Sequence, residues 1–156
     1  QGIASMNTTF RTRSLALAAV AVAAALAGCS TTTQIANGNL CMSAINQGVP
    51  APGEPVLARA CEPGQNQQWA FSGTGRITGV GNLCLDVQGG VGRDGAAVVY
   101  MPCSGAPSQF WTARSNSIVG VGGRCLDNGG DAVRGGPLVV NSCNGSLGQS
   151  WVSVPR

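Results

Sequence analysis

Short apolar runs, separated by glycine-rich or polar turns, follow one another from about residue 35 to the end of the chain. Residues 76–80, 83–87 and 97–103 are three of these runs, and Gly81-Asn82 separates the first two. Runs of this length, bounded by turn residues, predict β-strands. No stretch after the N-terminal segment has the 3.6-residue period of a helix, so the pattern predicts an all-β domain.

The same order of runs recurs nearer the C-terminus, at residues 118–121, 125–127, 138–140 and 149–154. The earlier part of the chain is looser, because its connecting loop carries Pro50, Pro52 and Pro55 and its run 56–61 is interrupted by Arg59. Three units of about four short strands each predict a closed, pseudo-threefold domain, since closure removes exposed sheet edges.

A short motif accompanies these runs three times. Each copy has a cysteine, a glutamine six residues later and a tryptophan eight residues later: Cys61, Gln67 and Trp69; Cys103, Gln109 and Trp111; Cys143, Gln149 and Trp151. A second cysteine precedes each copy, and these leading cysteines step by 43 and then 41 residues. A period of this length indicates three copies of one supersecondary unit.

The six cysteines of the repeats divide evenly, two in each copy. Six cysteines allow 15 pairings in principle, but the repeat selects one, since each copy must satisfy its own pair in the same way. A zinc site would need close Cys-x-x-Cys pairs or histidines, and the chain has neither. We expect no metal or cofactor and three local disulfides, each stabilising the fold by roughly 3 kcal/mol: Cys41–Cys61, Cys84–Cys103 and Cys125–Cys143.

The N-terminal segment has the features of an export signal. Residues 1–5 are interpreted as a scar or read-through before Met6, and Arg11 and Arg13 supply positive charge before the apolar residues 15–27. This apolar stretch is too short for a bilayer core, which needs roughly 20 helical residues. It is typical of a signal peptide over residues 1–28.

The end of that segment, Leu26-Ala27-Gly28-Cys29, resembles the lipobox of bacterial lipoproteins. The resemblance implies lipid on Cys29, a tether over residues 29–34 and attachment to the bacterial envelope. Ser30, where an aspartate would imply retention at the inner membrane, favours the outer membrane. An ordinary signal peptide with a chance cysteine is the alternative.

Charge and residue types narrow the function classes. The chain has no histidine and no lysine, and its net charge of +3 falls to +1 without Arg11 and Arg13. This balance gives no electrostatic reason to expect nucleic acid. A Ser/His/Asp or Cys/His site is excluded without histidine. Asp86 and Asp127 occupy equivalent positions of different repeats, so they should not form the carboxylate pair of a glycosidase, and we expect no enzyme.

The Gln-x-Trp triplets, the Cys-Leu-Asp phrases at 84–86 and 125–127 and the period near 42 residues together resemble the ricin B-type lectin domain. The resemblance implies a β-trefoil over residues 35–156, with repeats at 35–76, 77–117 and 118–156. In that family the tryptophan packs into the barrel and the glutamine braces the backbone. It therefore implies structural roles for Gln67, Trp69, Gln109, Trp111, Gln149 and Trp151.

The resemblance also implies a sugar pocket in each repeat. The family uses an aspartate two residues after the first cysteine, an aromatic platform two residues before the second, and an asparagine before the Gln-x-Trp glutamine. The second repeat keeps the aspartate, and its carbohydrate-binding positions are Asp86, Met101, Ser108 and Gln109. The corresponding positions of the third repeat are Asp127, Asn141, Gly148 and Gln149. The first repeat has Ser43 for the aspartate and Arg59 at the platform, but keeps Asn66.

Two hypotheses follow from this incomplete set. Asp86 and Asp127 either bind a glycan, which makes the chain a lipid-anchored carbohydrate-binding module, or they stabilise turns through local backbone N–H groups. In the second case the chain is a degenerate trefoil that binds a protein partner or acts in the envelope. We expect Tyr100 to face inward; a slip of one residue would instead make it the missing platform.

Overall fold

The computed structural model describes residues 31–130 and 134–155, so the predicted signal peptide and Cys29 lie outside the described residues. Its strands are β1 Thr33–Asn37, β2 Leu40–Ser43, β3 Leu57–Ala60, β4 Ala70–Phe71, β5 Ile77–Thr78, β6 Cys84–Val87, β7 Ala96–Met101, β8 Thr112–Arg114, β9 Ser117–Val119, β10 Arg124–Asp127, β11 Gly136–Pro137, β12 Val139–Ser142 and β13 Val152–Pro155. Its 3-10 helices are η1 Gln65–Gln67, η2 Val80–Asn82, η3 Gln88–Gly90, η4 Pro107–Gln109, η5 Val121–Gly123 and η6 Leu147–Gln149.

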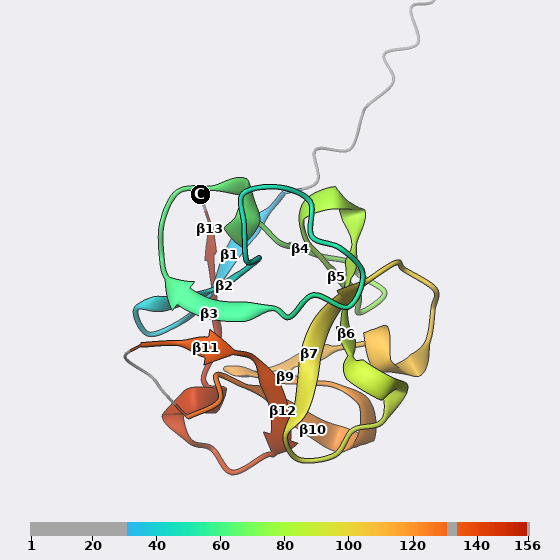
Figure 1. Ribbon diagram of the computed structural model, residues 1–156. Coiled ribbons are helices and arrows are strands. Elements are labelled where there is room, and N and C mark those ends of the chain that lie inside the picture. The colour runs from blue at the N-terminus through green and yellow to red at the C-terminus, as the bar shows by residue number, and fades with distance from the viewer. Residues whose placement is uncertain (1–30, 131–133, 156) are drawn as a thin grey trace, which may run out of the picture.

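The described chain is therefore all-β, as the repeat pattern predicts, and none of its helices is long and apolar enough to cross a membrane. The strands form a five-stranded sheet in the order β11-β3-β2-β1-β13 and an eight-stranded sheet in the order β4-β5-β6-β7-β12-β10-β9-β8. Both sheets contain strands from more than one repeat, so the repeats interlock (Figure 1).

A ring of three backbone hydrogen bonds marks the pseudo-threefold axis. The N–H of Val56 donates to the carbonyl of Val98, Val98 donates to Leu138, and Leu138 donates back to Val56, over 2.9, 2.9 and 2.8 Å. All three side chains are fully buried. One residue from each repeat thus meets at the centre of the fold.

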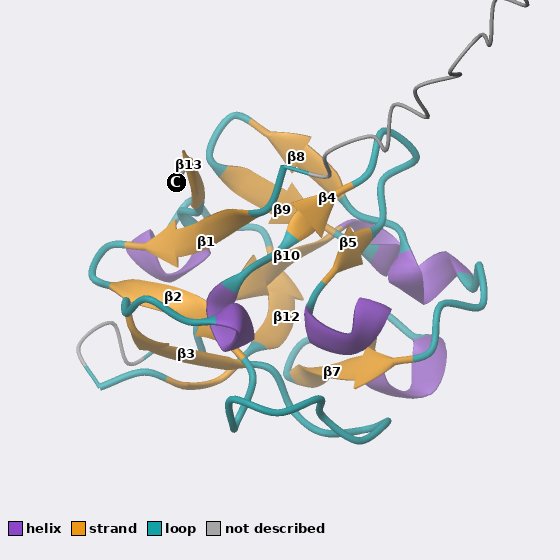
Figure 2. Cartoon of the chain, turned by 90° about the horizontal axis from the view of Figure 1, so that it is seen from above, coloured by secondary structure: helices purple, strands orange, loops and turns teal. Residues whose placement is uncertain are grey.

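The end of each repeat is joined in the same way to the start of its own first strand or to a residue just before that strand. Backbone hydrogen bonds connect Trp69 to Thr33, Trp111 to Gly75 and Trp151 to Asn116. The described ends of the chain also lie together, because β1 pairs with β13 in the register Thr33 to Pro155. Seen from above, β4, β8 and β13 gather on one side of the molecule, and β3 and β7 lie on the opposite side (Figure 2).

The three tryptophans are part of the hydrophobic core, as the resemblance implies. Trp69, Trp111 and Trp151 are at most 3% exposed, and their indole nitrogens donate to the carbonyls of Met42, Leu85 and Leu126. Tyr100 is fully buried and stacks on Trp69 with ring centroids 5.4 Å apart, so the inward prediction is confirmed.

The three expected disulfides are present, Cys41–Cys61, Cys84–Cys103 and Cys125–Cys143. Each disulfide cross-links the two paired central strands of its own repeat. The cysteines are 20, 19 and 18 residues apart in the sequence.

Three local predictions are wrong. Thr33 and Gln34 belong to β1 and not to a tether, and Gln34 is buried because its amide donates to the side-chain oxygen of Gln67. Arg59 does not interrupt its strand, since its position is exposed and β3 pairs with β2 along its whole length. The last strand of each repeat begins after the Gln-x-Trp triplet, because the glutamines 67, 109 and 149 end 3-10 helices.

Candidate functional site

A pocket of about 350 Å³ lies in the second repeat, between β6, β7 and η3. It contains three of the predicted binding residues of this repeat, Asp86, Met101 and Ser108. Its remaining lining residues are Gly53, Val87, Gln88, Gly89, Gly90 and Val99.

Asp86 supplies a carboxylate with one oxygen held and the other unpaired. Its Oδ2 accepts a hydrogen bond of 2.9 Å from the side-chain amide of Gln109. Its Oδ1 is buried and has no hydrogen-bond partner among the described residues. An unpaired buried oxygen of a charged group costs free energy, and Asp86 lines the pocket, so a ligand hydroxyl that reached this atom would be stabilised.

Gln109 does not present its amide to the pocket. The side chain is 1% exposed, its nitrogen also donates to the carbonyl of Pro102, and its oxygen accepts from the N–H groups of Ser104 and Gly105. All of its hydrogen-bonding capacity is used inside the protein. It therefore orients Asp86 instead of offering a free polar group.

Apolar and small residues form the walls around Asp86. Met101 is half-buried at the platform position, and Val99 lies opposite Asp86 in the pairing of β6 with β7. Gly89 and Gly90 also line the pocket, with positive φ values of 76° and 73° that glycine adopts without strain. Because they have no side chains, their backbone itself forms this part of the wall. A carboxylate beside an apolar wall suits a ligand with both hydroxyls and a C–H face.

Gly53 reaches this pocket from the first repeat. Its N–H donates to the carbonyl of Tyr100 over 2.7 Å, and the neighbouring Pro55 forms a bridge to Val99. The proline-rich loop of the first repeat is thus fastened along β7. Sequence reasoning missed this residue, because the repeat pattern assigns each pocket only residues from its own copy.

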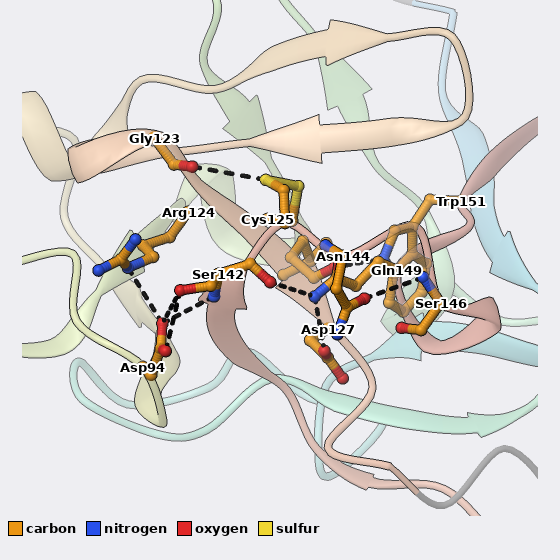
Figure 3. The surroundings of a disulfide bond; sticks show 12 residues. Asp94, Gly123, Arg124, Cys125, Asp127, Ser142, Asn144, Ser146, Gln149 and Trp151 are labelled. Carbon is orange, nitrogen blue, oxygen red and sulfur yellow. Dashed lines mark hydrogen bonds and ion pairs between the residues drawn. A yellow bond between two sulfur atoms is a disulfide. The ribbon is translucent and has the colours of Figure 1, made fainter.

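In the third repeat both oxygens of the equivalent carboxylate accept hydrogen bonds within the protein. Oδ2 of Asp127 accepts from the amide of Gln149 over 3.0 Å, and Oδ1 accepts from the N–H of Gly129 over 3.0 Å. Gln149, like Gln109, is buried and also bonded to the backbone of its repeat, at Ser142 and Asn144 (Figure 3). Asp127 therefore has the local turn bond that the alternative interpretation expects, whereas Asp86 has none.

Asn141, at the platform position of the third repeat, is also engaged within the protein. Its side-chain oxygen accepts from the N–H of Gly95 in the second repeat over 2.9 Å. Beside it, Asp94 accepts hydrogen bonds from Ser142 and forms an ion pair of 3.1 Å with Arg124 (Figure 3). This part of the third repeat fastens two repeats together.

The first repeat has no carboxylate at this position. Ser43 is fully buried, its hydroxyl donates to the carbonyl of Ala44, and it accepts from the amide of Asn66. At the platform position, Arg59 donates to the carbonyl of Ile45. Within the described residues, no group of three or more histidine, cysteine, aspartate or glutamate side chains could hold a metal ion.

Comparison with known protein families agrees with this geometry. Residues 31–151 match the model of the ricin-type beta-trefoil lectin domain. The chain belongs to this family. The ricin-type fold suggests carbohydrate binding in general, and together with three disulfides it suggests an exported protein. No match was found among curated protein sequences.

Solved structures similar to this ricin-type domain include natural and designed trefoils. The designed threefold-symmetric protein ThreeFoil has 23% identity and a TM-score of 0.71, over 80% of this chain and 99% of that one. The C-terminal half of an earthworm R-type lectin, in complex with GalNAc, has 18% identity and a TM-score of 0.69, over 81% and 99%.

The similar structures include an enzyme. An exo-beta-1,3-galactanase from Clostridium thermocellum has 20% identity and a TM-score of 0.71, but the match covers 81% of this chain and only 30% of that one. At these identities the similarities establish the trefoil fold of this ricin-type chain and nothing more specific.

Proposed function

We propose that this protein is a carbohydrate-binding module whose principal site is the pocket around Asp86. The observation that supports the proposal is the difference between two equivalent carboxylates. Oδ1 of Asp86 is buried and unpaired beside a pocket of about 350 Å³, whereas both oxygens of Asp127 accept hydrogen bonds within the protein.

The expected mode of binding uses the two chemistries of a neutral sugar. A sugar hydroxyl donates to Oδ1 of Asp86, while Gln109 keeps Oδ2 in place. The hydroxyl of Ser108 can donate or accept, and Met101 and Val99 face the C–H surface of the ring. The module binds its ligand directly through these side chains and does no catalysis.

A glycan array tests this proposal. We expect Asp86→Asn to weaken binding about 10- to 150-fold, because a hydrogen bond to a charged group contributes about 1.5–3 kcal/mol. Asp127→Asn is the matched control, since it changes the equivalent carboxylate in a repeat without a free oxygen. Equal losses in the two variants, or full binding by Asp86→Asn, would contradict the assignment.

We also propose that lipid on Cys29 attaches the module to the outer membrane of a bacterium. The support is the lipobox-like sequence at residues 26–29, at the end of an apolar segment. Two or more acyl chains give stable anchoring, whereas one gives only marginal binding. Intact-mass measurement of the cell-derived protein tests this part: a mature chain that begins at residue 29 with added acyl mass supports it, and an unmodified Cys29 rules it out.

A second candidate function is a trefoil scaffold that binds a protein partner. It is favoured by the first and third repeats, in which the predicted pocket positions are occupied by internal hydrogen bonds. A partner captured by this protein that free sugars do not displace, together with a silent glycan array, would support this function over carbohydrate binding.

A further inference from the structure

A second surface with its own chemistry lies where the ends of the repeats meet, away from the sugar pocket. It surrounds a pocket of about 260 Å³ to which all three repeats contribute, through Phe71, Ala113 and Ser153. We call this surface the barrel mouth and define it by Phe71, Ala113, Val152 and Val154 with Arg76 and Arg114. It is on the side of β4, β8 and β13, opposite β7 (Figure 2).

The barrel mouth exposes large apolar side chains to solvent. Phe71, Val152 and Val154 are 40%, 52% and 39% exposed. Val152 and Val154 are two residues apart on β13, so they project from the same face of the strand. The floor of the pocket is also apolar, because it contains the buried Trp151.

The charges around this surface have one sign. The segments that carry the residues lining the pocket are 31–36, 70–78, 110–119 and 150–155, and their only charged side chains are Arg76 and Arg114. The carboxylates of the described chain all belong to other segments, namely Glu54, Glu62, Asp86, Asp94 and Asp127. An exposed apolar patch flanked by arginines and free of acids fits a surface with negative headgroups.

The chain enters the fold at this surface. Thr33 lines the pocket of the barrel mouth and lies four residues after Cys29. Four residues extend at most about 14 Å. A membrane attached through Cys29 must therefore lie close to the barrel mouth and cannot reach the far side of the domain.

We propose that the barrel mouth rests on an anionic lipid surface. Phe71, Val152 and Val154 enter the headgroup region, and Arg76 and Arg114 meet lipid phosphates. This inference rests on the proposed membrane attachment. It also orients the molecule, since β7 and the Asp86 pocket it lines then face away from the membrane toward external glycans.

Fluorescence quenching of the full chain on vesicles tests the contact. Phe71→Trp places a reporter in the barrel mouth, and Val91→Trp places one at an exposed valine between β6 and β7. The vesicles contain phosphatidylethanolamine and phosphatidylglycerol at a ratio of about 3:1 with brominated acyl chains. After subtraction of the wild-type signal, we expect the barrel-mouth reporter to lose its fluorescence and the reporter of the Val91→Trp variant to change little.

A charge variant separates lipid contact from simple tethering. We expect Arg76→Ala with Arg114→Ala to weaken the contact roughly 5-fold for each arginine, so quenching of the barrel-mouth reporter falls toward its value on neutral phosphatidylcholine vesicles. Equal quenching of both reporters, quenching of neither, or a dimer that shields the barrel-mouth reporter without vesicles would overturn the proposal. The acyl mass on Cys29 is measured separately. A protein without lipid on Cys29 is therefore distinguished from a lipidated protein whose barrel mouth does not contact the membrane.

Discussion

The side-chain nitrogen of Gln109 lies 2.9 Å from Oδ2 of Asp86, and this bond ties the structural Gln-x-Trp triplet of the second repeat to the carboxylate of its pocket. The third repeat repeats the bond between Gln149 and Asp127. In the first repeat Gln67 has no carboxylate to hold, and its nitrogen donates to the carbonyl of Ala60. The glutamine of the triplet therefore has a structural role in all three repeats. It also positions a carboxylate in the two repeats that have an aspartate two residues after the leading cysteine.

Replacing this glutamine should affect stability and binding together. We expect Gln109→Met to lower the free energy of unfolding by about 1–3 kcal/mol, because it leaves buried partners unsatisfied, and also to weaken glycan binding. Gln67→Met is the matched control and should lower stability while binding is retained. Denaturant unfolding and glycan titration of both variants check this; a loss of binding in Gln67→Met equal to that in Gln109→Met would contradict it.

Restoring an aromatic platform should strengthen the site. We expect Met101→Phe to tighten glycan binding roughly 2- to 13-fold, since aromatic packing contributes about 0.5–1.5 kcal/mol. Asn141→Phe at the equivalent position of the third repeat should give no gain, because it breaks the bond to Gly95 beside a carboxylate that is already satisfied. Titration calorimetry with the array-selected glycan distinguishes these outcomes.

Two glycines pack closely against the rings of two buried tryptophans. A Cβ at Gly79 would lie 2.8 Å from the ring of Trp69, and one at Gly120 would lie 2.7 Å from the ring of Trp111. We expect Gly79→Ala and Gly120→Ala each to destabilise the fold by about 1–3 kcal/mol through overpacking. Gly73→Ala, where a Cβ meets open space, is the control and should unfold like the wild type.

Tyr100 combines a fully buried ring with a hydroxyl that has no hydrogen-bond partner among the described residues. Tyr100→Phe removes the unsatisfied group and keeps the stacking on Trp69, so we expect the free energy of unfolding to stay equal or to rise by up to about 1–3 kcal/mol. A large loss of stability in this variant would show that the hydroxyl is satisfied in solution.

The same residue should determine stability at high pH. Burial raises the pKa of Tyr100, so the unfolded chain ionises first as the pH rises. The stabilising effect is complete below the unfolded pKa of about 10 and decreases above it by about 1.4 kcal/mol per pH unit. The chain has one tyrosine and no lysine, so Tyr100→Phe should remove this decrease. Unfolding measured between pH 9 and about 11 tests the sign.

The triple repeat was sufficient to predict a closed pseudo-threefold β domain and the disulfide pairing, because both follow from three copies adopting one conformation. The trefoil and the buried tryptophans followed from the resemblance to the ricin B-type domain. The repeat could not distinguish Asp86 from Asp127. β6 continues past Asp86 to Val87, whereas β10 ends at Asp127 and the chain turns, so that the N–H of Gly129 reaches the carboxylate. A difference of one residue in strand length therefore decides whether the aspartate keeps an unpaired oxygen.

The contribution of Gly53 was equally hidden in the sequence. Its position depends on the path of a long loop that crosses to β7 of the next repeat, and the spacing of cysteines and tryptophans carries no information about that path. The boundary of the fold was misplaced for a related reason, because Gln34 is polar and its burial depends on a partner, Gln67, that is distant in the sequence.

The threefold joining of repeat ends makes the natural ends of the domain interchangeable with its other two corners. Thr33 and Pro155 are paired neighbours, and the turns at 72–76 and 115–116 occupy the equivalent corners. A circular permutant that links the native ends and opens at either turn should keep the same fold. Each choice would move the point of entry by a third of a revolution about the pseudo-threefold axis. An attached anchor would then hold the Asp86 pocket in a new direction on the same fold.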